Sequence, residues 1–174
     1  GVLFSDAQEF VPAVFRLDGE KIDVKMRLKG DGVNHLMGDK WSYRVRTRGN
    51  DTFMGMTQFS MHQPETRNWA YEWLGHRLMK AENVVALRYE FVDATLNGKH
   101  LGVYAVEEHF EKRLIESNRK REGPLIRFNE DLMWHEIADQ TRPFPGAEKS
   151  GTGDYLVAEA EGFQTSRILA NPAM

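Results

Sequence analysis

The sequence predicts an α+β fold, in which a mostly antiparallel β-sheet carries one or two packed helices. Three observations lead to this prediction: two segments in which apolar and basic residues alternate, an Asn-Gly turn between two apolar segments, and a run of apolar residues at helical spacing. The chain has 174 residues, 41% of them hydrophobic and 28% charged, so it fits one domain of ordinary size. Its apolar runs are far shorter than the roughly 20 residues that a membrane-spanning helix needs.

The first two predicted strands cover residues 24–29 and 41–48, and each has one basic face. Apolar and basic or polar residues alternate along both segments, with the period of two that is typical of a half-buried strand. Residues 30–40 between them contain three glycines and are expected to form a loop. If the two strands pair, their basic faces coincide, which costs roughly 0.2 to 1 kcal/mol for each pair of like charges. We therefore expect acidic neighbours or a bound anion on this face.

A third strand, a helix and a hairpin complete the predicted sheet. Alternation predicts a strand at residues 57–62. Apolar residues at helical spacing then predict one amphipathic helix from Thr66 to about Asn83, packed on the sheet. Asn97-Gly98, between two apolar segments, is the strongest short-range signal for a β-hairpin. Because these two segments are apolar on both faces, we expect their strands to be central.

The remainder of the chain predicts a second helix, a short strand and a linker. Helical spacing follows residue 108 and stops at Gly123-Pro124, and residues 125–128 are expected to add a strand. Residues 140–154 have the proline, glycine and small polar residues of a flexible loop or linker. Asn171-Pro172 is a good start for a further helix, so we expect residues 155–174 to begin the connection to a second lobe. On this interpretation residues 1–174 form a single N-terminal lobe of a larger protein.

Charge and motif content exclude several classes of function. The net charge is −3, but eight Lys and Arg residues against three Asp lie between residues 21 and 48, so the positive charge is concentrated. The absence of cysteine excludes disulfides and thiolate metal sites, and leaves the compartment open. The six histidines lack the spacing of known metal motifs, so no metal site is predicted. GxSxG and Walker-type motifs are also absent from the sequence.

Four segments in order resemble the CotH family, the spore-coat-H-like atypical protein kinases. They are RLKG at residues 27–30, DKWSYRV at 39–45, TRNWAYEWL at 66–74 and LNGKHLGVYAVEE at 96–108. The resemblance covers about residues 24–128, and its clearest mark is the hairpin with NG, GVY and a following Glu. The chain departs from the family's pattern in its loop at residues 31–34 and in having Asp39-Lys40 where the family has paired lysines.

The resemblance implies the N-terminal lobe of a kinase-like fold. The intact protein would bind ATP and Mg²⁺ and pass the γ-phosphoryl group to a Ser or Thr hydroxyl of a partner protein. In the family, the second lobe carries the catalytic aspartate and the aspartate that holds magnesium. We therefore expect no catalytic residue in this chain and no activity from it alone.

Eight residues are candidates for the nucleotide site. Lys29, Lys40 and Arg44 would contact phosphates, since phosphoryl transfer needs cations that offset the charge on the phosphoryl oxygens. Glu72 would pair with one of the lysines, and Arg67 would meet an anion at the start of its helix. The backbone at Val106, Glu107 and Glu108 would meet the adenine edge. The competing interpretations are a solvated basic face, surface salt bridges, and glutamates that cap the following helix.

Two other functions stay open at this point. The first is a non-catalytic surface or structural module that binds proteins, which the absence of the second-lobe aspartate from the full-length protein would favour. The second is a domain for polyanions such as nucleic acid or acidic glycan, which predicts steeply salt-dependent binding with no preference for adenine. The acidic remainder of the chain weighs against nucleic acid as a partner.

Overall fold

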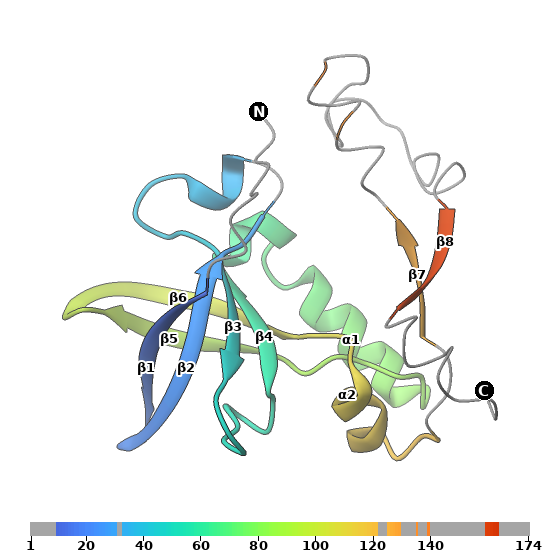
Figure 1. Ribbon diagram of the computed structural model, residues 1–174. Helices are drawn as coiled ribbons and strands as arrows, with labels where there is room; N and C mark the ends of the chain where they lie inside the picture. The colour runs from blue at the N-terminus through green and yellow to red at the C-terminus, as the bar shows by residue number, and fades with distance from the viewer. Residues whose placement is uncertain are drawn as a thin grey trace. The chain divides into compact units, whose positions relative to one another are not determined.

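The computed structural model describes residues 10–30, 33–121, 125–129, 135, 139 and 159–163. The chain divides into two compact units, one formed by residues 3–121 and the other by residues 122–174 with residues 1–2. Among the described residues, the first unit holds a six-stranded sheet with two α-helices, and the second holds a two-stranded sheet (Figure 1). No helix in the described part of the chain is long and apolar enough to cross a membrane.

The six-stranded sheet is antiparallel throughout, with the strand order β1-β2-β3-β4-β6-β5. Its strands are β1 (Val11–Leu17), β2 (Glu20–Leu28), β3 (Tyr43–Thr47), β4 (Gln58–His62), β5 (Tyr89–Leu96) and β6 (Lys99–Glu108). The helices of this unit are the 3₁₀ segments η1 (Val33–Leu36) and η2 (Pro64–Arg67) and the α-helices α1 (Tyr71–Ala81) and α2 (Lys112–Ser117). The predicted α+β class with a mostly antiparallel sheet is confirmed.

The two faces of this sheet differ in chemistry. One face carries the hydrophobic core, in which Val24, Val45 and Phe59 come from three neighbouring strands and are fully buried. Phe53 stacks on Phe59 with the ring centroids 4.9 Å apart and closes the core from the loop before β4. Side chains alternate along each strand, so the basic residues of β2 and β3 lie on the opposite face. We call that opposite side the basic face.

The basic strands pair as the sequence predicts. Arg27 lies opposite Arg44, and Lys25 lies opposite Arg46. The ring of Phe10 lies 5.6 Å from the guanidinium carbon of Arg27 and 4.6 Å from that of Arg46. These cation–π contacts offset part of the repulsion between like charges.

The Asn97-Gly98 hairpin is confirmed, but the predicted position of its strands is only half right. Asn97 and Gly98 both have positive φ, 49° and 85°, as a two-residue turn between twisted strands requires. β6 is an inner strand, whereas β5 is the last strand of the sheet. Although β5 lies at the sheet edge, it is apolar because it packs against β6 and α1.

The predicted helix from Thr66 is interrupted. Residues 64–67 form η2, and α1 begins only at Tyr71, because Asn68 and Trp69 are left-handed with φ of 51° and 63°. Asn tolerates this conformation, but for Trp it is a strained backbone that the surrounding structure must hold. α1 packs on β5 through the stacked rings of His76 and Tyr89. Its Leu74 and Leu78 remain more than half exposed.

The other predicted elements have mixed outcomes. α2 confirms the second helix and buries Leu114 and Ile115. β7 (Leu125–Asn129) confirms the last short strand, and it pairs with β8 (Glu159–Phe163), which the sequence analysis did not predict. β1 was also not predicted. The expected linker at residues 140–154 lies outside the described residues, and so does the expected helix start at Asn171.

Candidate functional site

Glu107 lies on the basic face near the end of β6. Its neighbours in the sheet are Ser60 of β4 and Tyr89 of β5. Lys29, which directly follows β2, donates from Nζ to Glu107 Oε2 at 3.2 Å. Both side chains are mostly buried, with 20% of Lys29 and 17% of Glu107 exposed. This ion pair supplies the acidic neighbour that the basic strands were expected to need.

Three further side chains surround this ion pair. We define the Glu107 cluster as Lys29, His62, Arg67, Glu72 and Glu107. His62, at the end of β4, is fully buried, and its Nδ1 lies 4.0 Å from Glu107 Oε2. Its other ring nitrogen, Nε2, lies 3.1 Å from the Tyr89 hydroxyl. Arg67 at the end of η2 approaches Glu72 of α1, with 3.7 Å between Nε and Oε1.

Several polar atoms of the Glu107 cluster are buried but lack a hydrogen-bond partner among the described residues. They are His62 Nδ1, Arg67 Nε and Glu72 Oε2. A buried polar atom without a partner costs about 1 to 3 kcal/mol, so native proteins rarely keep several together. Their concentration at one place favours a site whose missing partner is a ligand or an ion.

Burial and mutual charge shift the pKa values in the Glu107 cluster. Burial lowers the pKa of Lys29, and Arg67 and Arg44 act in the same direction against the attraction of Glu107. Burial alone would raise the pKa of Glu107, but Lys29 and Arg67 outweigh it and the pKa is lowered. Burial and the charge of Lys29 lower the pKa of His62 to about 3, so its imidazole is neutral at pH 7. Burial raises the pKa of Glu72.

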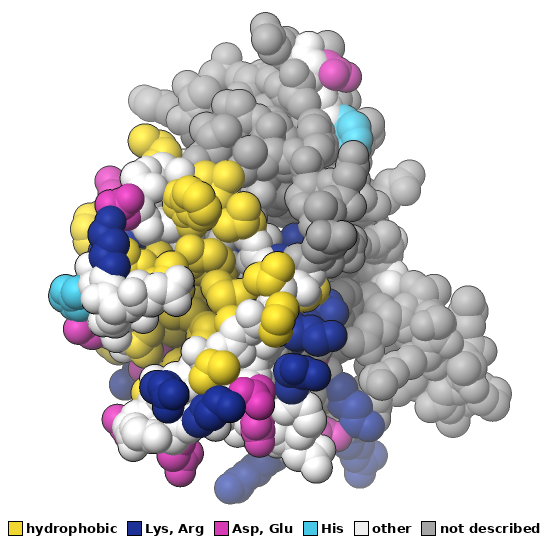
Figure 2. Space-filling view, turned by 60° about the vertical axis from the view of Figure 1, so that its left-hand side comes forward, with side chains coloured by type: hydrophobic (Ala, Val, Ile, Leu, Met, Phe, Trp, Pro, Cys, Tyr) yellow, Lys and Arg dark blue, Asp and Glu magenta, His cyan; other side chains and the backbone are white. Residues whose placement is uncertain are grey.

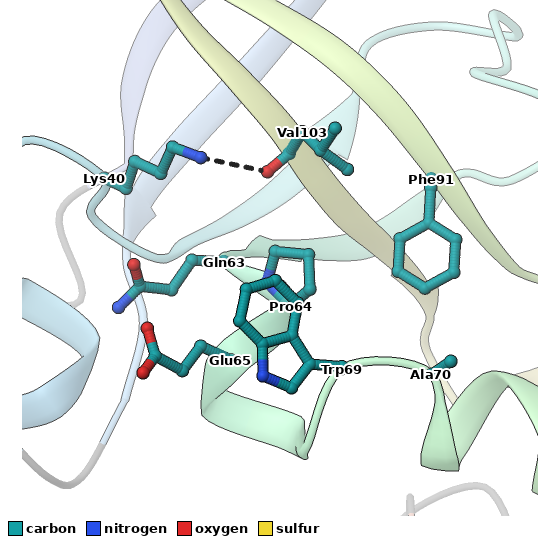
Figure 3. A pocket seen from close by; sticks show the side chains of 8 residues that line it. All are labelled: Lys40, Gln63, Pro64, Glu65, Trp69, Ala70, Phe91 and Val103. Carbon is teal, nitrogen blue, oxygen red and sulfur yellow. Dashed lines mark hydrogen bonds between the residues drawn. The ribbon is translucent and has the colours of Figure 1, made fainter.

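A pocket of about 300 Å³ opens beside η2 and α1 (Figure 3). Its lining residues are Lys40, Gln63, Pro64, Glu65, Trp69, Ala70, Phe91 and Val103. The Lys40 side chain crosses one side of this pocket and donates from Nζ to the Val103 carbonyl at 3.4 Å, while the rings of Trp69 and Phe91 supply apolar walls. The strained backbone at Trp69 therefore carries a side chain that is 64% exposed at the pocket.

Figure 2 shows hydrophobic side chains gathered on one face of the molecule, with Lys and Arg side chains along its lower edge. Exposed apolar surface next to positive charge is typical of a surface that binds a ligand with an apolar part and an anionic part.

The structure brings some of the predicted site residues together and separates others. Lys29, Arg67 and Glu72 meet in the Glu107 cluster, but Glu72 pairs with Arg67, and Lys29 pairs with Glu107. The predicted pair of Glu72 with a lysine is not among these ion pairs, and it stays a prediction. Arg44 faces Arg27 on the basic face, and Lys40 lies at the pocket.

Val106 and Glu108 lie in the sheet and its core. Val106 is fully buried and has strand neighbours on both sides, Met61 and Glu90. Glu108 is 1% exposed and accepts hydrogen bonds from the backbone N–H and the side chain of Arg88. Neither Glu107 nor Glu108 caps α2, because the N-cap residue of that helix is Glu111.

His62 and Tyr89 are not among the site residues predicted from the sequence. No sequence spacing links His62, Glu72 and Glu107: the pairing of β4 with β6 brings His62 beside Glu107, and α1, which packs on β5, supplies Glu72. The sequence carries no clear signal for His62, because it continues the polar positions Gln58 and Ser60 of an alternating strand.

The fold and the Glu107 cluster together define an antiparallel sheet with a cation-rich, partly buried site on one face, which suits an anionic ligand. Residues 26–158 match the family described as CotH kinase protein, so the chain belongs to this family. The resemblance found in the sequence is thereby confirmed, and the protein is kinase-like. No curated protein matches the chain.

Proposed function

We propose that this chain is the nucleotide-binding lobe of a CotH kinase, which holds ATP with Mg²⁺ for phosphoryl transfer to a Ser or Thr hydroxyl of a partner protein. The observation that supports this most is the convergence of Lys29 and Arg67 on Glu107, beside buried polar atoms of His62 and Glu72 that lack hydrogen-bond partners among the described residues. Catalysis of phosphoryl transfer depends mainly on positioning and on cations that neutralise the phosphoryl oxygens.

The carboxylates of the Glu107 cluster hold its cations in place for the phosphates. Glu107 fixes the ammonium of Lys29, and Glu72 lies beside the guanidinium of Arg67. Cations ordered in advance lose less conformational freedom when the ligand binds, which favours affinity. Mg²⁺ would enter with the phosphates that it binds, and we assign no residue of this chain to it.

The apolar pocket would take the base. Val103 lines the pocket and Glu107 belongs to the cluster, and both lie on the same face of β6. They lie four positions apart along the strand, which is about 13 Å. An extended nucleoside triphosphate spans such a distance. Trp69 and Phe91 offer rings against which a base packs, and stacking on an aromatic side chain contributes about 1 to 3 kcal/mol.

Isothermal titration calorimetry with Mg-ATP and with AMP tests this proposal. We expect ATP to bind, and the Lys29→Met substitution to weaken it about tenfold because a charge-assisted contact is lost. AMP should bind less tightly and be insensitive to the substitution. Lys21→Met is the matched control, since Lys21 is exposed and its ion pair in the described part of the chain is with Asp23.

A folded chain that does not bind ATP, or that binds it equally well with Lys29→Met and Lys21→Met, would contradict the proposal. We further propose that the chain alone does not transfer phosphate, because we assign no residue of it as the catalytic base. Release of labelled γ-phosphate to a protein acceptor by the purified chain would overturn that part.

The protein-binding module is the second candidate, and one observation favours it. α1 buries none of its residues, and Tyr71, Leu74 and Leu78 are all more than half exposed. A helix with an exposed apolar stripe is typical of an interaction surface. Absence of nucleotide binding by a well-folded chain would favour this candidate.

A further inference from the structure

We infer that His62, Glu72 and Glu107 form a binding site for a divalent transition-metal ion such as Zn²⁺ or Mn²⁺. The ion would be held by one imidazole nitrogen and two carboxylates. One potential ligand atom from each residue lies within 4.8 Å of the other two. Metal bonds of about 2.1 Å place tetrahedral ligands about 3.4 Å apart, so shifts of about 1 Å in two glutamate side chains close the site.

The histidine is the strongest observation for a metal. His62 is fully buried, and its Nδ1 points to Glu107 without a hydrogen-bond partner among the described residues. Its Nε2 lies within hydrogen-bond distance of the Tyr89 hydroxyl. Metal-binding histidines almost always use their second nitrogen in such a bond, which fixes the ring and the tautomer. When Nε2–H donates to Tyr89, the lone pair of Nδ1 is free to bind the ion.

Glu72 supplies a second atom that lacks a partner. Its Oε2 is buried without a hydrogen-bond donor in the described part of the chain, while its Oε1 faces Arg67. The carboxylates of Glu72 and Glu107 each have two oxygens, so each can keep its cation and still bind a metal with the other oxygen. The charged neighbours then take the place of an outer shell around the metal ligands.

The ligand set selects the metal. Imidazole suits Zn²⁺ and other transition metals, whereas Mg²⁺ prefers oxygen ligands and retains its water. We therefore expect Zn²⁺ and Mn²⁺ to bind more tightly than Mg²⁺. This preference separates the site from the Mg²⁺ that accompanies ATP in the proposed function.

Lys29 distinguishes the metal site from the phosphate site. Its ammonium is 3.2 Å from Glu107 Oε2 and repels a metal ion, although it attracts phosphate. Lys29→Met should therefore raise the affinity for Zn²⁺ about tenfold while it lowers the affinity for ATP. The two effects have opposite signs, so failure of one proposal is distinguishable from failure of the other.

The test is a calorimetric titration of the EDTA-treated, dialysed chain with Zn²⁺, Mn²⁺ and Mg²⁺, with unfolding curves recorded beside it. We expect one Zn²⁺ per chain, binding weakened at least about tenfold by Glu72→Gln or His62→Gln, and strengthened by Lys29→Met. Matched controls are His100→Gln and Glu90→Gln, which change exposed side chains of β6 and β5. Glu72→Gln keeps the test valid if the buried His62 variant does not fold.

Unchanged Zn²⁺ affinity in folded Glu72→Gln would overturn the inference. So would loss of binding in His100→Gln, which would instead place the ion at the exposed pair of His100 and Asp93. Equal affinities for Zn²⁺ and Mg²⁺ would also contradict it, because a site with an imidazole ligand discriminates between them.

Discussion

Glu107 and Glu108 are neighbours at the end of β6, but their side chains lie on opposite faces of the sheet and have different surroundings. Glu108 is almost completely buried and receives hydrogen bonds from the backbone N–H and the guanidinium of Arg88, at 3.0 Å and 2.9 Å to Oε2. Among the described residues, Glu107 accepts one hydrogen bond, from Lys29, and it lies beside polar atoms of His62 and Glu72 that lack partners there.

The difference shows how neighbouring residues of one strand can serve stability on one face of the sheet and ligand binding on the other. A carboxylate whose hydrogen bonds are complete within the protein has little capacity left for a ligand. A carboxylate surrounded by unpartnered polar atoms can gain by binding one. We therefore interpret Glu108 as a structural residue and Glu107 as the centre of the functional face.

The largest expected effect separates these two glutamates. Glu108→Gln leaves the guanidinium of Arg88 without its buried partner and should lower the free energy of unfolding by about 3 kcal/mol. Glu107→Gln should lower it by only about 1 kcal/mol, because Glu107 accepts a single hydrogen bond among the described residues, from Lys29, whereas Glu108 accepts several from Arg88. Urea unfolding measures both values. Equal losses in the two variants would mean that Glu107 is also a structural residue.

An intermediate effect concerns Gly30, which follows Lys29 in the chain. Gly30 has φ of +124°, and an added Cβ would collide with the ring of His35. Gly30→Ala should therefore lower the free energy of unfolding by about 2 kcal/mol and also weaken ATP binding. Gly38→Ala is the control, since its φ is also positive but nothing lies within 4 Å of the added carbon. It should cost only about 1 kcal/mol. Equal costs would show that contact with His35 is unimportant.

The smallest expected effect is a pH dependence of the free energy of unfolding that arises from His35. Burial and then the charge of Lys29 lower the pKa of His35 to about 4. Between pH 6.5 and 4 the unfolded chain therefore binds more protons at this residue than the folded chain. The contribution of His35 to the free energy of unfolding is fully present above pH 6.5 and is lost as the pH falls towards 4. Solvent screening limits the loss to about 1 kcal/mol.

Unfolding curves at several pH values, compared between the wild type and His35→Gln, measure this contribution. The variant should lose less stability than the wild type between pH 6.5 and 4. The same loss in both proteins would assign the pH dependence to other groups.

Local patterns in the sequence predict much of the fold. Alternation of apolar and basic residues locates β2 and β3, and Asn97-Gly98 locates the β5–β6 turn, because both depend on neighbours in the chain. The break at Asn68 and Trp69 is not predictable in this way, since Trp has no intrinsic preference for a left-handed backbone. The edge position of β5 depends on strand order, which local sequence does not encode.

The candidate site was predictable only in part. Lys29, Arg67 and Glu72 follow from charge pattern and family resemblance. Their partners do not, because Glu107 reaches Lys29 across 78 residues of chain and His62 meets Glu107 through the pairing of β4 with β6. The two adjacent glutamates looked equivalent in sequence, and only the alternation of side chains along β6 assigns them to different faces.

The most direct test of the central claim is backbone amide chemical-shift mapping by NMR during a titration of the chain with Mg-ATP. We predict shifts at Lys29, Arg67, Glu107 and the Trp69 side of the pocket, with Arg88 nearly unchanged. Shifts centred on Arg88, or none at concentrations where a matched calorimetric titration shows binding, would contradict the assignment of the nucleotide to the Glu107 side.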